Sequence, residues 1–235
     1  MNKVYIGFDS SNYGQQLAFD VCKRSIEKFN KDIEVIKLVK QDLIDQKLFW
    51  REDKTGATEF TYTRFLVPYL NNYDGWALFC DSDFLWTCDV NELFEKYSDS
   101  KNAVSCVKHN YTNCHGKTKM DGRPQEFYPR KNWSSLMLFN CSHPDIKNLT
   151  IENVNTKSPK WLHRMEYCND NNIGSLPFEY NYLVNYYDTD NYKALHFTDG
   201  GPWHEKYRDV IYGDLWIDYL INHQFSFHFR ILILI

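Results

Sequence analysis

The sequence predicts a single α/β domain in which helices flank a central, mainly parallel mixed sheet. Three observations support this fold class. The first forty residues read as strand, polar loop, helix and strand, the pattern of a right-handed βαβ unit in a parallel sheet. Apolar runs and amphipathic segments go on alternating through most of the chain. Two of the apolar runs end in acidic residues, which is where ligand groups lie in an open α/β sheet.

The individual elements follow from hydrophobic spacing. The run KVYIGF at 3–8 predicts a buried first strand, and the run at 33–39 predicts a second. Between them, apolar residues recur at the spacing of one helix face: Leu17, Val21, Cys22, Ile26 and Phe29. Further strands are expected at 76–80, 103–109, 134–141, 172–177 and 192–197. Further helices are expected at 58–70 (closing near Pro68), 90–97, 149–154, 161–167 and 214–221.

The length of 235 residues suits one domain with its own core, and no linker rich in Pro, Gly or Ser divides the chain. We expect this domain to span 1–235, with a core at about 3–220 and an apolar tail at 221–235. The tail is too short to cross a bilayer, which needs about 20 apolar residues. We expect it to be a core strand or an edge, with peripheral membrane contact as the alternative.

Charge and cysteine usage narrow the function classes. The net charge of −4 argues against a nucleic-acid partner, which would require a basic face. The seven cysteines are scattered and never form a C-x-x-C pair, so buried thiols in a reducing compartment are favoured over disulfides or a zinc site. No apolar segment typical of a signal peptide follows the N-terminus. These features predict a cytoplasmic protein without a transmembrane segment.

The strongest local signal is the stretch WALFCDSDFLW at 76–86, where an apolar strand ends in Asp81-Ser82-Asp83. Two carboxylates one residue apart repel each other unless a proton or a cation lies between them. Hard cations such as Mn²⁺ and Mg²⁺ prefer oxygen ligands and are often shared between carboxylates and substrate phosphates. A short D-x-D motif is also common by chance, as solvated loop carboxylates or as a helix cap.

A second cluster lies at 195–204, LHFTDGGPWH. His196 ends an apolar strand, and an imidazole can complete a metal shell, more readily for Mn²⁺ than for Mg²⁺. Gly200 and Gly201 allow close backbone approach, so their N–H groups could bind phosphate oxygens. Either cluster alone is compatible with an ordinary turn. Together they describe a metal-bridged diphosphate site.

The ordered set of D-x-D, WSSLMLFN, LPFEYNYL and HFTDGGPW resembles the GT-A fold glycosyltransferases, and most of all the family-8-type nucleotide-sugar enzymes with their bacterial and viral relatives. The resemblance covers roughly residues 3–220. It implies a GT-A (Rossmann-like) domain and a hexosyltransferase. Asp81, Asp83 and His196 would be the ligands of Mn²⁺ or Mg²⁺, and the donor would be a nucleotide sugar, expected to be linked to UDP.

The resemblance also implies a donor site built from several segments. The residues expected to contact the nucleotide or sugar are Phe8, Asp9, Ser10, Tyr13, Arg64, Ser82, Trp133, Ser135, Gly200, Gly201 and Trp203, in addition to Asp81. Arg64 could neutralise phosphate or pair with Asp81, and Trp133 could equally be a core residue. Asp83, Asn181 and Glu179 are the expected catalytic residues. Asn181 is preferred as a sugar contact, while Glu166, Glu179 and Asp121 are the carboxylates considered for the sugar's β face.

The expected reaction is metal-dependent transfer of a sugar to a glycan, glycoprotein or polysaccharide acceptor, with retention at the anomeric carbon. Two features depart from the family pattern. The lysine often found in the last motif is missing, so that Lys206, His204 or the metal alone would carry its role, and the Asp-Gln pair before the LP segment is replaced by MEYCNDNNIG. The alternatives are a metal-dependent phosphohydrolase or a carbohydrate-binding protein with a degenerate transferase site.

Overall fold

The computed structural model describes residues 1–11, 13–52, 56, 58–110 and 129–224. Its main element is a six-stranded sheet with the strand order β2-β1-β3-β6-β5-β7. These strands are β1 (Lys3–Phe8), β2 (Glu34–Val39), β3 (Trp76–Cys80), β5 (Val104–Val107), β6 (Leu136–Asn140) and β7 (Ile173–Leu176). The pairs β1–β2, β1–β3 and β5–β7 are parallel, whereas β6 runs antiparallel to both β3 and β5. The predicted mixed, mainly parallel sheet is therefore confirmed.

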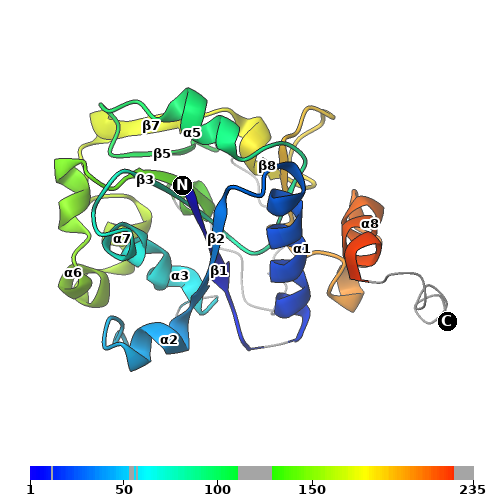
Figure 1. Ribbon diagram of the computed structural model, residues 1–235, viewed down its shortest axis with the longest axis horizontal. Helices are drawn as coiled ribbons and strands as arrows, with labels where there is room; N and C mark the ends of the chain where they lie inside the picture. The colour runs from blue at the N-terminus through cyan, green and yellow to red at the C-terminus, as the bar shows by residue number, and fades with distance from the viewer. Residues whose placement is uncertain (12, 53–55, 57, 111–128, 225–235) are drawn as a thin grey trace.

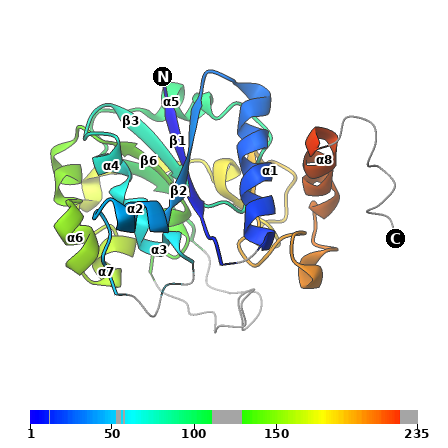
Figure 2. The ribbon, with the colours of Figure 1, turned by 60° about the horizontal axis from the view of Figure 1, so that its bottom comes forward.

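Helices cover both faces of this sheet (Figures 1 and 2). On one side lie α1 (Tyr13–Phe29) and α8 (Gly213–Gln224), and on the other α2 (Lys40–Asp45), α3 (Phe60–Thr63), α6 (Ile151–Thr156) and α7 (Pro159–His163). The alternation of strand side chains explains the two layers. Tyr5, Phe79 and Phe139 pack with the α2–α3 side, while Ile6, Leu78 and Leu138 pack with α1.

A second, three-stranded sheet was not predicted. It has the order β4-β9-β8, formed by β4 (Phe84–Trp86), β9 (Ala194–His196) and β8 (Tyr182–Leu183). The expected strand at 192–197 therefore exists, in shortened form, but joins this small sheet instead of the main one. Strands of two or three residues are too short to show an alternating pattern, so only their pairing with distant segments defines them.

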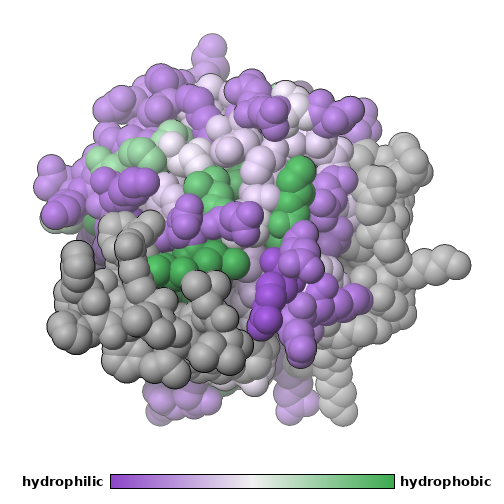
Figure 3. All heavy atoms as spheres, turned by 90° about the vertical axis from the view of Figure 1, so that its right-hand side faces the viewer, coloured by the Kyte–Doolittle hydropathy of each residue, from purple (hydrophilic) through white to green (hydrophobic). Residues whose placement is uncertain are grey.

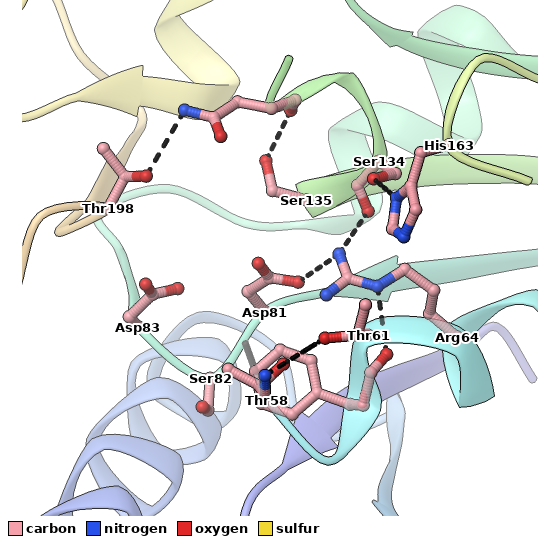
Figure 4. Close-up of polar contacts among 12 residues, drawn as sticks. Thr58, Thr61, Arg64, Asp81, Ser82, Asp83, Ser134, Ser135, His163 and Thr198 are labelled. Atoms are coloured by element: carbon pink, nitrogen blue, oxygen red, sulfur yellow. Dashed lines mark hydrogen bonds and ion pairs between the residues drawn. The ribbon is translucent and has the colours of Figure 1, made fainter. Parts of the chain in front are cut away.

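The expected helix at 58–70 differs in detail. It is divided into α3, a 3₁₀ turn at Arg64–Leu66 and α4 (Val67–Leu70), and it continues past Pro68. Pro68 is tolerated because it lies in the first turn of α4, where a missing N–H breaks no helical hydrogen bond. The 3₁₀ turn places the Arg64 side chain beside Asp81 (Figure 4). Helix α2 was also unexpected, while α5 (Asn91–Tyr97) lies where a helix was predicted.

The six cysteines within the described residues are unpaired, and Cys22, Cys80, Cys106 and Cys141 are buried. Burial raises the pKa of the Cys106 thiol to about 12, which keeps it protonated. Cys114 and most of the apolar tail lie outside the described residues. No helix within the described ranges is long and apolar enough to cross a membrane. On the face nearest α8, apolar residues form small areas separated by hydrophilic side chains (Figure 3).

Helix α5 is tied to the small sheet by an ion cluster around Glu92. Its Oε2 accepts hydrogen bonds from Lys193 Nζ at 2.6 Å, Lys96 Nζ at 2.8 Å and the Tyr180 hydroxyl at 3.0 Å. The hydrogen bonds from Lys193 and then Lys96 lower the pKa of Glu92 to about 2. A carboxyl whose folded-state pKa lies below its unfolded value stabilises the fold above that unfolded value.

We therefore predict that Glu92→Gln removes part of the acid dependence of folding stability. The Glu92 contribution is complete above about pH 5 and is lost as the pH falls towards 2, because the unfolded carboxyl protonates near 4.3. At neutral pH the substitution should cost about 1 kcal/mol. Urea unfolding at several pH values measures this dependence, with Glu95→Gln on the same helix as control. Equal slopes for wild type and Glu92→Gln between pH 2 and 5 would contradict the prediction.

Candidate metal and donor site

The two aspartates lie in the short connection between the two sheets. Asp81 follows β3 of the main sheet, and Asp83 precedes β4 of the small sheet. Backbone bonds fix both ends of the connection, because Asp81 N donates to Ser135 O at 3.0 Å and Phe197 N donates to Asp83 O at 3.0 Å. Asp81 and Asp83 point towards the same side, whereas Ser82 points away (Figure 4). Its hydroxyl lies 3.5 Å from Gln15 Oε1.

His196 completes the group. It is the last residue of β9 and pairs in register with Phe84 of β4, so it lies beside the residue that follows Asp83. Ligand atoms of Asp81, Asp83 and His196 all lie within 4.8 Å of one another. His196 Nε2 is 3.3 Å from Asp83 Oδ1, and Phe84 stacks on the imidazole with ring centroids 4.5 Å apart. The structure thus brings together the three residues predicted as metal ligands.

Arg64 neutralises one of the two carboxylates. Its Nη1 lies 2.7 Å from Asp81 Oδ1 and also donates to Ser134 O at 2.8 Å, while Nε donates to Phe60 O at 3.1 Å. The guanidinium lies 4.9 Å from the ring centroid of Phe79, and the residue is buried. Of the two roles predicted for Arg64, the structure contains the ion pair with Asp81.

The group fits a divalent cation. Its donor set of two carboxylates and one imidazole suits Mn²⁺ and also Mg²⁺. Asp83 Oδ1 is buried and accepts no hydrogen bond within the described part of the chain, and His196 Nε2 lies 3.3 Å from it. A buried carboxylate oxygen needs a proton or a cation as partner. A metal bound between Asp81, Asp83 and His196 would supply that partner.

The loop after β1 reaches the same edge of the sheet. Asp9 accepts hydrogen bonds from Ser11 N at 2.9 Å and from Glu59 N at 3.3 Å, and Ser10 donates through N and Oγ to Glu59 Oε2 at 2.7 and 2.8 Å. Phe8 carries Lys37 Nζ over its ring at 3.5 Å. These bonds fasten the β1 loop to the start of α3, the helix that leads to Arg64. The side chain of Tyr13 lies outside the described part.

The glycine turn after β9 needs its glycines. Gly200 has φ of +134°, and a side chain there would collide with Tyr207, while one on Gly201 would collide with the Trp203 ring. Trp203 packs against Phe197 and Trp216 of α8, with ring centroids 6.1 and 5.5 Å apart. These contacts pack the half-buried Trp203 against the core cluster between the small sheet and α8. The proposed contacts of the turn with a diphosphate stay predictions.

Other predicted site residues have partners of their own. Trp133 Nε1 donates to His109 O at 3.2 Å, and Ser135 Oγ donates to Asn132 O at 2.7 Å. The Glu179 carboxylate accepts from Asn191 at 2.9 Å, and Glu166 pairs with Lys160 at 3.7 Å. Lys206 and His204, suggested for the missing lysine, are exposed. Asp121 lies outside the described residues.

Two residues near the site were not predicted from the sequence. Glu59 holds the β1 loop, but an acidic residue before a helix has no feature that separates it from an ordinary cap. His109 follows β5 at the same sheet edge, and its Nδ1 lies 2.7 Å from the Tyr187 hydroxyl. Burial, with a smaller effect from the neighbouring His196, lowers the pKa of His109 to about 3. The sequence feature that could have identified His109 as a site residue is its position after an apolar strand.

Comparison with known proteins identifies the family. No protein-family model matches the sequence. The chain is 42% identical over 224 residues to Protein CDI of Arabidopsis thaliana, a match that covers 92% of this chain and 85% of that protein. The chain belongs to the Protein CDI family.

Solved structures identify the fold of this CDI-family chain. The glycosyltransferase GlyE of Streptococcus pneumoniae TIGR4 superposes with a TM-score of 0.60 at 14% identity, over 93% of this chain and 60% of GlyE. The galactosyltransferase LgtC, in complex with donor and acceptor sugar analogs, superposes with a TM-score of 0.56 at 14% identity, over 96% of this chain and 97% of LgtC. The chain thus has the predicted GT-A glycosyltransferase fold, and it spans about three fifths of the length of GlyE.

We predict that Arg64→Met destabilises the CDI-family chain strongly in the absence of metal. Removing one partner of a buried ion pair leaves the Asp81 carboxylate without the guanidinium, which costs about 3–5 kcal/mol. Arg24→Met is the matched control, because within the described residues Arg24 makes one hydrogen bond, 3.4 Å long, to Leu220 O, so its loss should cost about 1 kcal/mol or less. Chemical denaturation measures both. Equal losses for the two variants would show that the Arg64–Asp81 pair does not hold the site.

Proposed function

We propose that the protein is a metal-dependent glycosyltransferase that moves a sugar from a nucleotide-diphosphate donor to a glycan or glycoconjugate acceptor. The main observation behind this proposal is that ligand atoms of Asp81, Asp83 and His196 lie within 4.8 Å of one another at the carboxyl end of β3. The GT-A fold supports this reading, since ligands of open α/β sheets bind at that edge. The names of GlyE and LgtC as glycosyltransferases agree with it. UDP is the expected nucleotide, and retention the expected stereochemistry.

In this proposal Asp81, Asp83 and His196 hold Mn²⁺, or Mg²⁺. The bound cation supplies Lewis-acid stabilisation of the negative charge on the departing diphosphate. Arg64 holds the Asp81 carboxylate in place through their 2.7 Å ion pair. The buried surroundings strengthen each of these electrostatic contacts relative to water. The protein's own part in leaving-group departure is thus a pre-formed cation site that needs no proton donor.

Other segments give the proposed donor site its shape. The β1 loop with Phe8, Asp9 and Ser10 is fastened by Glu59 and would present the base and ribose contacts. The turn of Gly200 and Gly201 would lie beside the diphosphate, and a backbone N–H contact would come from Gly201, because Gly200 N already donates to Phe197 O at 2.9 Å. Glu179 stays the predicted catalytic carboxylate. A cytoplasmic location is proposed from the unpaired cysteines.

A panel of nucleotide sugars with Mn²⁺ tests the proposal. We expect at least one UDP-sugar to bind, and the protein to release UDP slowly alone and faster with a suitable glycan acceptor. Asp83→Asn should weaken Mn²⁺ binding by about 100-fold or more and abolish this release, because it removes a ligand charge. Glu205→Gln, at an exposed glutamate, is the control and should change neither.

Three outcomes separate the alternatives. Release of inorganic phosphate from nucleotides without sugar transfer would favour a phosphohydrolase. Binding of glycans without any nucleotide binding would favour a degenerate carbohydrate-binding protein. Unchanged Mn²⁺ binding and turnover in Asp83→Asn would refute the proposed site itself.

A further inference from the structure

We propose that Asn181 is a positioning residue that holds the His196 imidazole with Nε2 directed at the two aspartates. The inference rests on the proposed metal site and names what orients one of its ligands. A chain of hydrogen bonds carries it, from the Asn132 carbonyl through Ser135 and Asn181 to His196. Donors and acceptors along this series of hydrogen bonds can be assigned in one way, because the Asn132 carbonyl oxygen at its start can only accept.

The first link is the bond from Ser135 Oγ to Asn132 O, 2.7 Å long. A carbonyl oxygen accepts only, so the serine hydroxyl must give its hydrogen to Asn132. Ser135 Oγ is then left with lone pairs for its second neighbour. Asn132 is itself anchored, since its side-chain Nδ2 donates to Thr198 Oγ1 at 3.3 Å, as the upper dashed line in Figure 4 shows.

The second link fixes the orientation of the Asn181 amide. The neighbour of Ser135 Oγ at 2.9 Å must be a donor, so it is the amide nitrogen Nδ2 of Asn181. The amide oxygen Oδ1 therefore faces His196 Nδ1, at 2.8 Å. The reverse orientation of the amide would set its oxygen against the lone pairs of Ser135.

The third link fixes the imidazole. An amide oxygen accepts only, so Nδ1 of His196 must carry a hydrogen, and in the neutral ring Nε2 then carries the lone pair. Nε2 lies 3.3 Å from Asp83 Oδ1. A lone pair and a carboxylate oxygen at that distance repel each other unless a positive charge lies between them. A proton on Nε2 or a metal ion would remove that repulsion, and the nearby Asp81 carboxylate gives a metal ion its third ligand.

Burial decides between this role and direct sugar contact. Asn181 is 0% exposed and His196 is 1% exposed, and both the nitrogen and the oxygen of the Asn181 side-chain amide make hydrogen bonds within the protein. A side chain without accessible surface cannot touch a sugar hydroxyl. We therefore assign Asn181 to the orientation of His196 instead of the sugar contact expected from the sequence.

Mn²⁺ titration followed by electron paramagnetic resonance tests the assignment. Asn181→Leu keeps the size of the side chain but has no acceptor, and it should weaken Mn²⁺ binding about 10- to 100-fold. Asn181→Asp keeps an acceptor for Nδ1–H, and the Ser135 hydroxyl can rotate to donate to it, so binding should return to near the wild-type level. Ser135→Ala should weaken binding less than Asn181→Leu, because it frees the amide to turn.

Asn140→Leu is the matched control. Asn140 is a buried asparagine that pairs with Trp76 at the opposite end of β3, so its loss should lower stability without changing Mn²⁺ affinity. Nitrogen NMR of ¹⁵N-labelled histidine in the metal-free protein, at a pH where the ring is neutral, should show His196 protonated at Nδ1. Asn181→Leu should populate both tautomers.

The outcomes separate this inference from the proposed function. If wild-type protein does not bind Mn²⁺, the proposed metal site fails and the role of Asn181 fails with it. If wild type binds but Asn181→Leu binds equally well, or Asn140→Leu weakens binding as much, only the positioning role is overturned. If Asn181→Leu does not fold, a loss of binding in Asn181→Asp as severe as in Asp83→Asn overturns it.

Discussion

The placement of two carboxylates in the passage from one sheet to another is the constraint on which the site depends. Asp81 and Asp83 cannot move apart, because the backbone of each is bonded to a neighbouring segment, at Ser135 and Phe197. The repulsion between their two carboxylates must then be offset by positive charge placed nearby. At Asp81 this positive charge is the guanidinium of Arg64. The neighbour of Asp83 is the imidazole of His196, a group that can also be neutral. A proton or a cation beside Asp83 would complete the charge balance of this edge, and the three converging ligand atoms suit a cation.

The helix before the site is irregular at the residue that supplies this positive charge. Arg64 reaches Asp81 from the 3₁₀ turn between α3 and α4, and its Nε bonds back to Phe60 O in the preceding turn. Glu59, one residue before α3, holds the loop after β1. The short segment from Glu59 to Arg64 therefore holds both the guanidinium that pairs with Asp81 and the loop after β1. The irregular helix couples the first strand to the acidic connection.

The sequence was sufficient for the parts that depend on local pattern. The βαβ start and the strand ending at Cys80 were predicted in this way, and the structure confirms them. The ligand set of Asp81, Asp83 and His196 was implied by the family resemblance instead, and the structure brings the three residues together. The small sheet was not predictable, because β4 and β8 are too short for any periodicity. The link between Asn181 and Ser135 joins residues 46 positions apart, and no spacing rule connects them. Such contacts follow from the packed fold, which a single sequence does not encode in readable form.

The small sheet has a role beyond covering the site. Because side chains alternate along a strand, a slip of one residue between β4 and β9 would turn His196 to the opposite face. A further backbone bond, from Phe197 N to Asp83 O, holds the register Phe84↔His196, and the bond from Val184 N to His196 O fixes β9 against β8 on its other side. Val184 follows β8, the strand that Asn181 precedes. The register of these strands thus sets the face and the level at which the His196 imidazole lies, and the hydrogen bond from Asn181 sets the orientation of the ring. Both are needed for Nε2 to face the aspartates.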